Sequence, residues 1–258
     1  MNADRKQRIS DAFGAAVDRY DDHAGPQRSA ALLVADLAQR QKPQGGGRIL
    51  EIGCGTGFLT REIQLRWPGA ELVVTDIAPE MVGRAAWGGM VAGSFLTMDG
   101  ERPAFEGAWF DLILSSLAFQ WFDDPGAAVG RLTGLLRPGG SLFFSTMGER
   151  SFTRWRAAHR MAGLTAGVPD YPALADLRAL LAGQPDAFAF DEDYPLACPR
   201  ARDLLAHLKG IGAAVPAPGR APLTPAQLRR AMAAYDAADG DGDNYHVLFA
   251  RVTLPDRG

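Results

Sequence analysis

Three glycines at alternate positions directly after an apolar run constrain the fold of this chain more than any other feature of its 258 residues. Residues 49–57 read Ile-Leu-Glu-Ile-Gly-Cys-Gly-Thr-Gly, so Gly53, Gly55 and Gly57 follow a predicted buried strand. Glycine lets a chain turn sharply and brings bare backbone close to a ligand, which a Cβ atom would obstruct. The run therefore predicts a strand, a ligand-binding loop and a helix in direct succession.

An acidic residue also lies at the distance that a nucleoside-binding fold requires. Asp76 follows Gly57 by 19 residues and ends a second predicted strand, where its carboxylate can accept hydrogen bonds from both hydroxyls of a ribose. The dinucleotide fingerprint Gly-x-Gly-x-x-Gly does not fit, because Phe58 occupies the place of its third glycine. We predict a site for S-adenosylmethionine rather than NAD, with an ordinary glycine turn as the remaining alternative. Glu51, before the loop, would then bind the methionine ammonium group or brace the loop amides.

Polar residues at the ends of two further predicted strands complete this site. Asp99 and Gly100 end the third strand, where the carboxylate can accept from the adenine amine, and Ile77 can pack on the adenine ring. Ser115 and Ser116 end the fourth strand, at the carboxyl edge of the sheet where open α/β folds bind ligands. Their backbone can face the methionine half of the cofactor. A surface role for Asp99 is the alternative.

Predicted strands and helices alternate through the central part of the chain. Strands are expected at residues 48–52, 71–75, 94–98, 110–115 and 141–146, and the helices between them at 57–67, 79–86 and 125–136. Such alternation is typical of a parallel doubly wound sheet. Two later strands, at 188–197 and 245–254, can pair as an antiparallel edge. We therefore predict an α/β fold, Rossmann-like, with a mostly parallel seven-stranded sheet.

Helical segments flank this core on both sides. They are expected at residues 9–20, 27–41, 153–164, 174–182, 200–209 and 224–238. With 47% hydrophobic residues, the chain can bury one large core and needs no second domain. We expect one domain, whose parts are an N-terminal helical cover (1–47), a cofactor-binding core (48–147), a helical cap insertion (148–187) and C-terminal strands and helices (188–258).

The composition excludes several kinds of partner. A formal net charge of −3 gives no field that would attract nucleic acid or an anionic membrane. Cys54 and Cys198 are the only cysteines and lack CxxC spacing, which argues against a thiolate metal site and fits a reducing compartment. The first residues lack the apolar core of a signal peptide, and no segment has the length of a membrane span. We predict a cytoplasmic protein that needs no metal.

Several sequence blocks are not required by a generic cofactor-binding core. They are Lys6-Gln-Arg-Ile, Ala12-Phe-Gly14, Tyr20, His23-Ala24, Gln27-Arg28, Ser116-Leu-Ala-Phe-Gln-Trp121, Leu208-Lys-Gly-Ile-Gly-Ala213, Leu223-Thr224 and Tyr245-His-Val-Leu-Phe249. Residues 48–147 resemble the Rossmann-like methyltransferases, and these blocks resemble the malonyl-[acyl-carrier protein] O-methyltransferases of biotin synthesis. Two regions depart from that pattern: Gly25-Pro26 replaces an expected polar and aliphatic pair, and residues 148–200 match poorly.

The resemblance implies methyl transfer to the free carboxylate of a malonyl thioester on acyl-carrier protein or coenzyme A. The resulting ester would prime pimeloyl synthesis for biotin. A carboxylic acid with a pKa of about 4 is already ionised at neutral pH, so the reaction needs no general base. Alignment of the reacting atoms can contribute up to roughly 7 to 11 kcal/mol. The alternatives are a methyltransferase of this fold acting on another small carboxylate or a phenol, and a non-catalytic cofactor-binding protein.

The resemblance also suggests residues for the acceptor side of the site. Tyr20 is the predicted catalytic residue, because the resemblance places its helix across the cofactor pocket, where it would cover the methyl group. Trp121 is expected to form a wall of the pocket. The candidates for binding the malonyl carboxylate or the pantetheine phosphate are Arg28, Arg150, Arg154 and Lys209. Core packing for the aromatic residues and solvated surface positions for the cations are the alternatives.

A carrier protein presents an acidic helix, so its docking surface should be basic. Four arginines recur around the first predicted cap helix, at spacings that place much of their charge near one face: Arg150, Arg154, Arg156 and Arg160. We predict that this face binds the carrier protein, with an ordinary solvated helix face as the alternative.

Overall fold

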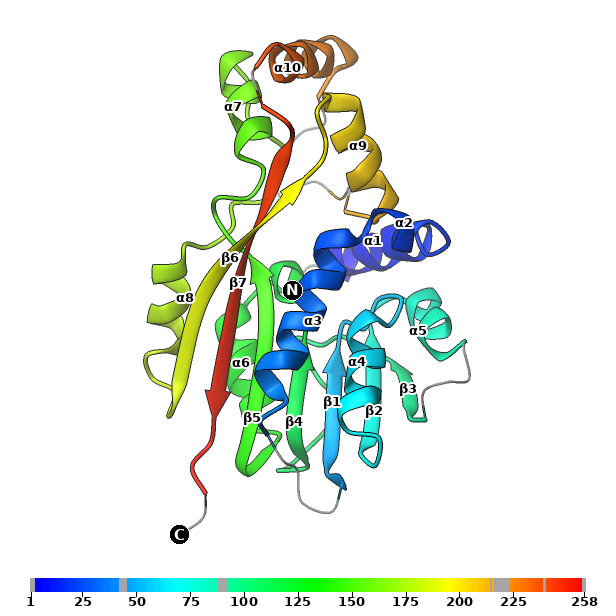
Figure 1. Ribbon diagram of the computed structural model, residues 1–258, viewed down its shortest axis with the longest axis vertical. Helices are drawn as coiled ribbons and strands as arrows, with labels where there is room; N and C mark the ends of the chain where they lie inside the picture. The colour runs from blue at the N-terminus through cyan, green and yellow to red at the C-terminus, as the bar shows by residue number, and fades with distance from the viewer. Residues whose placement is uncertain are drawn as a thin grey trace.

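A seven-stranded sheet forms the centre of the molecule (Figure 1). The computed structural model describes residues 3–41, 46–87, 92–213, 215, 223–238 and 240–256; the rest of the predicted cover, core and C-terminal segment lies outside the described residues. The strand order is β3-β2-β1-β4-β5-β7-β6. The strands are β1 (Arg48–Ile52), β2 (Glu71–Asp76), β3 (Ser94–Thr97), β4 (Phe110–Ser115), β5 (Leu136–Met147), β6 (Ala187–Leu196) and β7 (Asp243–Thr253).

The pairing confirms the predicted fold class. Strands β1 to β5 run parallel, and β7 is antiparallel to both β5 and β6. The chain fills the sheet outward from β1 in one direction, then returns to place β4 on the other side of β1, with Ile52 beside Ser115. Open α/β folds bind ligands at such a reversal of strand order, outside the carboxyl ends of the strands. The topology therefore places the glycine loop and the end of β4 side by side.

Two layers of helices cover the sheet. On one face lie α3 (Gly25–Ala38) and α4 (Phe58–Arg66), and on the other lie α6 (Pro125–Thr133) and α8 (Leu174–Leu181). Alternate residues of the buried strands serve the two layers: Ile49 packs with the first, Leu50 with the second. Helix α5 (Pro79–Ala86) packs against β2 and β3.

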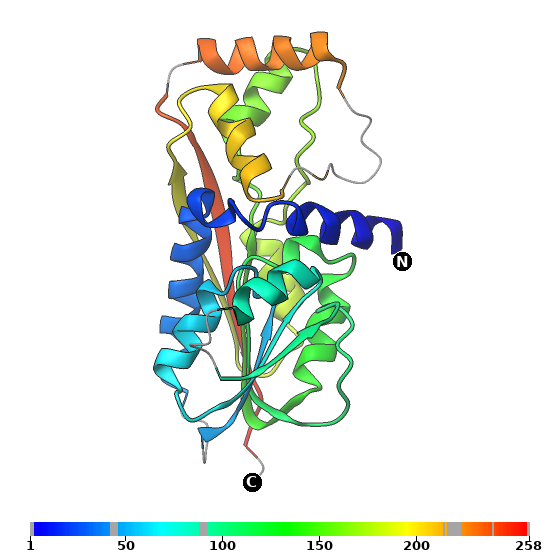
Figure 2. The ribbon, with the colours of Figure 1, turned by 90° about the vertical axis from the view of Figure 1, so that its right-hand side faces the viewer.

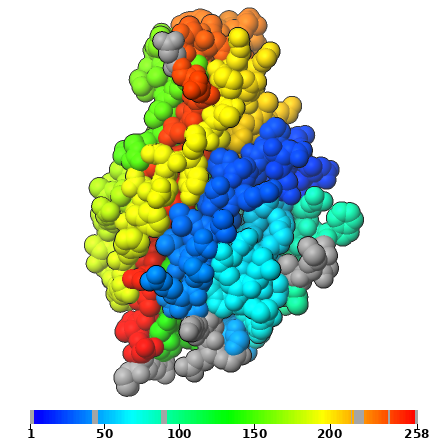
Figure 3. Space-filling model, viewed as in Figure 1, coloured from blue at the N-terminus to red at the C-terminus, as the bar shows by residue number. Residues whose placement is uncertain are grey.

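A helical cap lies beyond the carboxyl ends of the parallel strands, at the top of Figure 1. It consists of α7 (Thr153–Met161), α9 (Ala201–Gly210) and α10 (Pro225–Ala237). Helices α1 (Ala3–Gly14) and α2 (Tyr20–His23) lie between this cap and the core (Figure 2), and the space-filling view shows the same segment joining the two (Figure 3). One hydrophobic cluster continues from the sheet into the cap. None of the described helices has the length and apolar content that crossing a membrane would require.

The predicted cap insertion is distributed over two places. Helix α7 packs against α10 in the cap, whereas α8 packs on β6 and β7 beside the sheet (Figure 1). The cap is instead completed by α9 and α10, which the sequence analysis assigned to the C-terminal segment. The single domain remains our interpretation, with this different division of its helices.

Two predicted helices end earlier than expected. The helix predicted at 9–20 is divided: α1 ends at Gly14, a turn follows, and α2 begins at Tyr20. A Cβ atom on Gly14 would lie 2.5 Å from a carboxylate oxygen of Glu80, so a larger residue there would displace the Glu80 side chain at the start of α5. The helix predicted to reach residue 136 ends at Thr133, because Leu136 already pairs with Phe110 at the start of β5.

Candidate active site

The glycine loop has the geometry that its sequence predicts. Gly53, Gly55 and Gly57 have φ angles of 72°, 53° and 92°, in the left-handed region that glycine adopts without strain. A Cβ atom on Gly53 would lie 2.6 Å from the Cβ of Ala118, whereas one on Gly55 would meet no atom within 4 Å. The loop therefore leaves open backbone at Gly55 and a close contact between the ends of β1 and β4 at Gly53.

Asp76 connects this loop to the start of α5. Its Oδ2 atom accepts a hydrogen bond from the Gly55 amide and its Oδ1 atom accepts one from the Ala78 amide, both at 2.9 Å. Burial raises the pKa of Asp76, and these hydrogen bonds oppose the increase. A carboxylate has about four lone-pair sites, so two remain available to ribose hydroxyls.

Seven of the predicted cofactor-binding residues line one cavity. They are Gly53, Gly55, Asp76, Ile77, Asp99, Gly100 and Ser116. The other three lie behind its wall. Ser115 donates a hydrogen bond of 2.9 Å to the Ile52 carbonyl, Gly57 precedes the first residue of α4, and Glu51 is fully buried under the loop. The structure thus brings these residues to one sheet edge, and their roles with a ligand stay predictions.

Glu51 is an unusual buried acid. Neither of its carboxyl oxygens forms a hydrogen bond of good geometry in the described part of the chain, although Thr60 lies near enough to interact with them. Burial raises its pKa to about 8, although an interaction with Thr60 opposes the increase. Buried polar groups normally have partners, so this carboxyl is a candidate to bind an ammonium group; it lies under the loop and not in the cavity wall, so that contact stays a prediction. Within the cavity itself, the open backbone at Gly55 and the carboxylate of Asp76 are the groups suited to S-adenosylmethionine.

Lys6 is a residue of this cavity that the sequence analysis did not select. Its Nζ atom lies 3.1 Å from Asp99 Oδ1 and 2.7 Å from Glu101 Oε2. Burial raises the pKa of Glu101, but the hydrogen bonds from Lys6 and two backbone amides outweigh it and lower that pKa. Lys6 therefore holds α1 across the end of the cavity at Asp99. Lys6 belongs to the first sequence block that carries the family resemblance, but that block gave no indication of its role.

A second cavity of about 590 Å³ lies between the cap and the N-terminal segment. It shares four lining residues with the cofactor cavity: Phe13, Tyr20, Leu117 and Trp121. We call the larger one the acceptor cavity. Residues of β5, β7, α3, α7, α9, α10 and the segment between α7 and α8 contribute to the remaining wall, so residues far apart in the sequence form it. The shared residues mark the point where donor and acceptor groups can meet.

Tyr20 stands at this junction as a protonated phenol. Burial raises its pKa, and the negative charges of Asp76 and Asp21 raise it further. The side chain can therefore donate a hydrogen bond but is unsuited to act as a base at neutral pH. Its ring lies 6.5 Å from that of Phe58, at the start of α4. The turn that separates α1 from α2 is what brings Tyr20 to this position.

Leu117 contributes strained backbone to the same junction. Its φ angle is 51°, a conformation that costs a non-glycine residue about 1 to 3 kcal/mol. Its amide donates to Ser145 Oγ at 3.0 Å, and its carbonyl accepts from Gln120 Nε2 at 2.5 Å. These bonds fix the loop after β4. No motif in the sequence indicated the strain.

The acceptor cavity is lined mainly by apolar side chains and carries no charged side chain among its described lining residues. Its polar groups are those of Tyr20, Gln27, Gln120, His159, Thr165, Tyr171, Gln227 and Tyr245. Two predicted acceptor-binding cations lie elsewhere. Arg28 is exposed and stacks 4.7 Å from the centre of the Phe58 ring, and Lys209 is exposed on α9. As substrate ligands they stay predictions.

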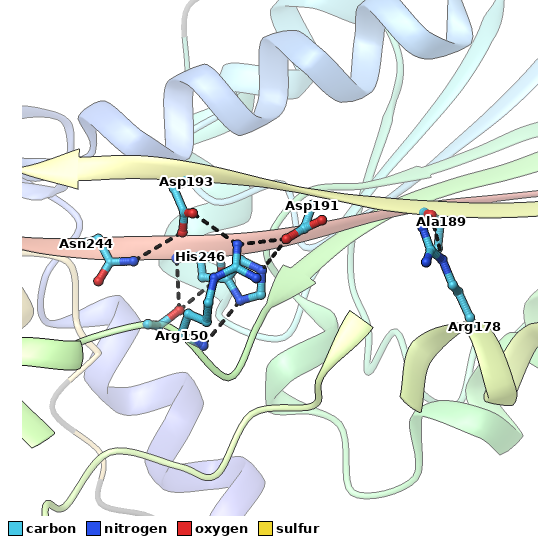
Figure 4. A network of polar contacts seen from close by, with 8 residues as sticks. Arg150, Arg178, Ala189, Asp191, Asp193, Asn244 and His246 are labelled. Atoms are coloured by element: carbon cyan, nitrogen blue, oxygen red, sulfur yellow. Dashed lines mark hydrogen bonds and ion pairs between the residues drawn. The ribbon is translucent and has the colours of Figure 1, made fainter. Parts of the chain in front are cut away.

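Arg150 and Arg154 also lie outside the acceptor cavity. Arg150 pairs with Asp191 at 2.7 Å and Asp193 at 3.0 Å on β6, and Asp191 contacts His246 at 2.9 Å (Figure 4). Arg154 donates to the carbonyl groups at the end of α10.

The four arginines of the proposed docking face point to different partners. Arg150 faces β6 and Arg154 faces α10, as described above. Arg156 donates to the carbonyls of Ser151 and Pro169, and Arg160 is exposed near the end of α7. The expected single basic face is therefore not formed. Within the described chain no group of three or more His, Cys, Asp and Glu residues is placed to hold a metal ion.

Comparison with known sequences identifies relatives along nearly the whole chain. A family model described as Methyltransferase domain matches residues 50–144. A malonyl-[acyl-carrier protein] O-methyltransferase of Magnetococcus marinus is 35% identical over 96% of this chain and 93% of its own length. A biotin biosynthesis bifunctional protein BioCD of Bordetella avium is 44% identical over 88% of this chain. The chain spans about half of that bifunctional protein, 48% of its length.

Solved structures show the same fold at lower sequence identity. The YcgJ protein of Bacillus subtilis has a TM-score of 0.61 at 14% identity, over 87% of this chain and 99% of its own. Phosphoethanolamine N-methyltransferase 2 of Haemonchus contortus, solved with S-adenosyl-L-methionine, has a TM-score of 0.56 at 17% identity, over 94% of this chain and 57% of its own. These likenesses support the fold and carry no statement about the acceptor.

Proposed function

The chain belongs to the malonyl-[acyl-carrier protein] O-methyltransferase family, and from that premise we propose that it methylates the free carboxylate of a malonyl thioester. The observation that carries this proposal is the meeting of the two cavities at Tyr20 and Leu117. The lining residues of one cavity suit S-adenosylmethionine, and the other cavity is large enough for the acyl end of a thioester. The product would be the methyl ester that primes pimeloyl synthesis for biotin.

The residues of the chain would act by holding and aligning the two substrates. Bound S-adenosylmethionine supplies an electrophilic methyl group on its sulfonium. The glycine loop, Asp76 and Asp99 would hold that cofactor. Tyr20 would close the junction against water, and its hydroxyl would donate a hydrogen bond to a carboxylate oxygen. A malonyl carboxylate with a pKa of about 4 is already ionised, so no residue needs to remove a proton. Alignment and exclusion of water then account for the rate.

The acyl-carrier protein is the proposed partner, because the relatives are named for it. Coenzyme A carries the same pantetheine arm, so malonyl-coenzyme A is the smaller alternative acceptor. The volume of the acceptor cavity, about 590 Å³ between the cap and the N-terminal segment, supports an acceptor that enters by its pantetheine arm. Arg28, Arg150, Arg154 and Lys209 lie outside that cavity, so we propose that any contact they make would be with the carrier rather than with the malonyl group.

A direct test uses methyl-labelled S-adenosylmethionine with four acceptors: malonyl-acyl-carrier protein, malonyl-coenzyme A, acetyl-acyl-carrier protein and free malonate. The expected result is base-labile label on the two malonyl thioesters alone. Label on another small carboxylate or a phenol, with none on malonyl thioesters, would replace the proposed acceptor. Cofactor binding without any labelled product would instead support a non-catalytic role.

A further inference from the structure

We propose that the acceptor carboxylate is held by neutral hydrogen-bond donors, with the Gln27 side chain in direct contact and Tyr245 and His207 positioning that side chain. This inference rests on the proposed function, since it names how the same site recognises its substrate. In this proposal the Gln27 amide, positioned by the Tyr245 hydroxyl, takes the place of the expected cation.

Gln27 is a buried amide that lines the acceptor cavity and has one atom without a hydrogen-bond partner among the described residues. It lies in the first turn of α3, only 8% of its surface is exposed, and it lines the acceptor cavity. Its Oε1 atom has no hydrogen-bond partner among the described residues. Because the oxygen and nitrogen of an amide are nearly equal in shape, the group can turn and place Nε2 where Oε1 lies, a position that neighbouring side chains cover and that the substrate reaches by displacing them. The Nε2 atom of Gln27 would then donate a hydrogen bond to an oxygen of the acceptor carboxylate.

Tyr245 and His207 support this amide from behind. Tyr245 is buried on β7, lines the same cavity, and interacts with Gln27. Its hydroxyl lies 2.9 Å from His207 Nε2. Burial lowers the pKa of His207 to about 4, with a contribution from His23, so the ring is neutral at physiological pH. With its proton on Nε2, His207 donates to Tyr245, whose own proton is then free for Gln27 Oε1, leaving Nε2 of Gln27 for the substrate.

A neutral site suits a carboxylate that must react as a nucleophile. A guanidinium or ammonium group paired with the carboxylate would stabilise its charge before reaction and hold both oxygens. Neutral donors such as Gln27 and Tyr20 can bind the same oxygen and leave the other free to approach the methyl group. Such a donor also discriminates against an acetyl thioester, because that substrate leaves the buried amide unpaired.

The test measures kcat and KM for malonyl-coenzyme A, and the affinity for S-adenosylhomocysteine, in purified variants. Gln27→Leu should lower kcat/KM roughly 10- to 150-fold, the loss expected for a hydrogen bond to a charged group. Tyr245→Phe should lower it less, about 5-fold, because it acts through Gln27. Gln64→Leu on α4 is the matched control, with both quantities unchanged. Affinity for S-adenosylhomocysteine should stay within about threefold of wild type in every variant.

Gln27→Glu distinguishes contact with the carboxylate from a packing role. The carboxyl group that this variant introduces would repel the substrate when ionised, whereas in its protonated form it can donate to the substrate, so activity should recover as the pH falls. The other titratable groups of this network are Tyr245 and His207 themselves, with Tyr20, Tyr171 and Cys198 acting on Tyr245 and His23 on His207, and the wild-type profile over the same range accounts for them. A Gln27→Glu profile parallel to wild type would overturn the proposal.

The remaining outcomes distinguish failure of the Gln27 proposal from failure of the proposed methyltransferase function. Wild-type protein that forms no ester on any malonyl thioester would contradict the proposed function itself. If the wild type is active and Gln27→Leu and Tyr245→Phe both keep kcat/KM within about twofold of it, only the proposed role of Gln27 would be contradicted. Loss of S-adenosylhomocysteine affinity in Gln27→Leu would assign Gln27 a structural role and also overturn the proposal.

Discussion

The cofactor cavity and the acceptor cavity are built on opposite physical principles, although they share a wall. In the cofactor cavity charges are paired within the protein: Lys6 bridges Asp99 and Glu101, and Asp76 already accepts two backbone amides. In the acceptor cavity the described lining is neutral, and Gln27 and Gln120 each keep an unpaired oxygen. The first is organised before its ligand binds, whereas the second keeps hydrogen-bonding capacity for its substrate.

The difference follows from how each wall is assembled. The cofactor cavity uses the ends of adjacent parallel strands, whose positions the sheet fixes. The acceptor cavity uses helices and segments that meet only in the folded chain, including Tyr20, Gln27 and Tyr245. Substitutions should therefore act strongly and selectively on cofactor affinity in one cavity, and on turnover in the other.

Asp76→Ala should have the largest effect. It removes two charge-assisted hydrogen bonds to the loop and α5 as well as the proposed contact with the ribose, each worth about 1.5 to 3 kcal/mol. We expect the affinity for S-adenosylhomocysteine to fall by at least about 100-fold, measured by calorimetry. Asp241→Ala, at an exposed position, is the control. Affinity within a few-fold of wild type would remove Asp76 from the site.

Tyr20→Ala should be next, and its effect should appear in turnover. Loss of the ring would open the junction to water and leave the acceptor poorly aligned, so we expect kcat to fall about 100-fold, the order of effect that misalignment produces. Tyr20→Phe keeps the ring and should cost about tenfold, because only one hydrogen bond is lost. Stopped-time assays at saturating substrates measure both. Equal effects of the two changes would show that the hydroxyl, rather than the ring, carries the function.

Local sequence patterns were sufficient to predict which residues form the cofactor cavity. Gly53, Gly55 and Gly57 have the positive φ angles that the loop requires, and the strand at 48–52 has its predicted bounds. Asp76 and Asp99 lie where the strand ends placed them, because in a parallel sheet the carboxyl end of each strand reaches the same edge.

The acceptor half depends on contacts that no local pattern contains. The spacing of the arginines on the first cap helix suggested one basic face, but their partners lie on β6, on α10 and near Pro169. A helical pattern gives the direction of a side chain but not the element that faces it. Gln27 stood in a recognised block, yet only its burial and its unpaired oxygen in the structure suggest a role.

Glu51→Gln tests whether the buried acid senses the cofactor. Between the ordinary value of 4.5 and the raised pKa of about 8, folded wild type binds a proton that the unfolded chain has released. Its free energy of unfolding should therefore fall as the pH rises through this window, whereas the variant should not show this loss. Binding of a cationic ammonium would favour ionised Glu51 and release its proton.

Calorimetry in buffers of different ionisation enthalpy can detect that proton. Wild type should release up to one proton on binding S-adenosylhomocysteine between the two pKa values, and Glu51→Gln should release none and bind about tenfold more weakly. Equal proton release by both proteins would show that Glu51 only braces the loop.

Arg154→Ala should affect stability rather than substrate selection. The guanidinium donates to the carbonyls of Tyr235, Ala238 and Gly240 and lies 4.1 Å from the centre of the Tyr235 ring. We expect the free energy of unfolding to fall by about 1 kcal/mol in urea titrations. KM should change equally for malonyl-acyl-carrier protein and malonyl-coenzyme A. A selective increase for the carrier-linked substrate would restore Arg154 to the docking surface.

Arg150→Ala should have the smallest effect and gives the sharpest test of the neutral acceptor cavity. Hydrogen bonds from Arg150 and then His246 lower the pKa of Asp191, so the stability gained from this network is present above the ordinary pKa of the acid and is lost as the pH falls. Because Arg150 is 46% exposed, the change should cost less than about 1 kcal/mol. KM for malonyl-coenzyme A should stay within about twofold of wild type, since the guanidinium pairs with β6 outside the cavity. A tenfold increase in KM without loss of stability would mean that Arg150 leaves Asp191 and Asp193 to bind the substrate, and the acceptor site would then depend on a cation after all.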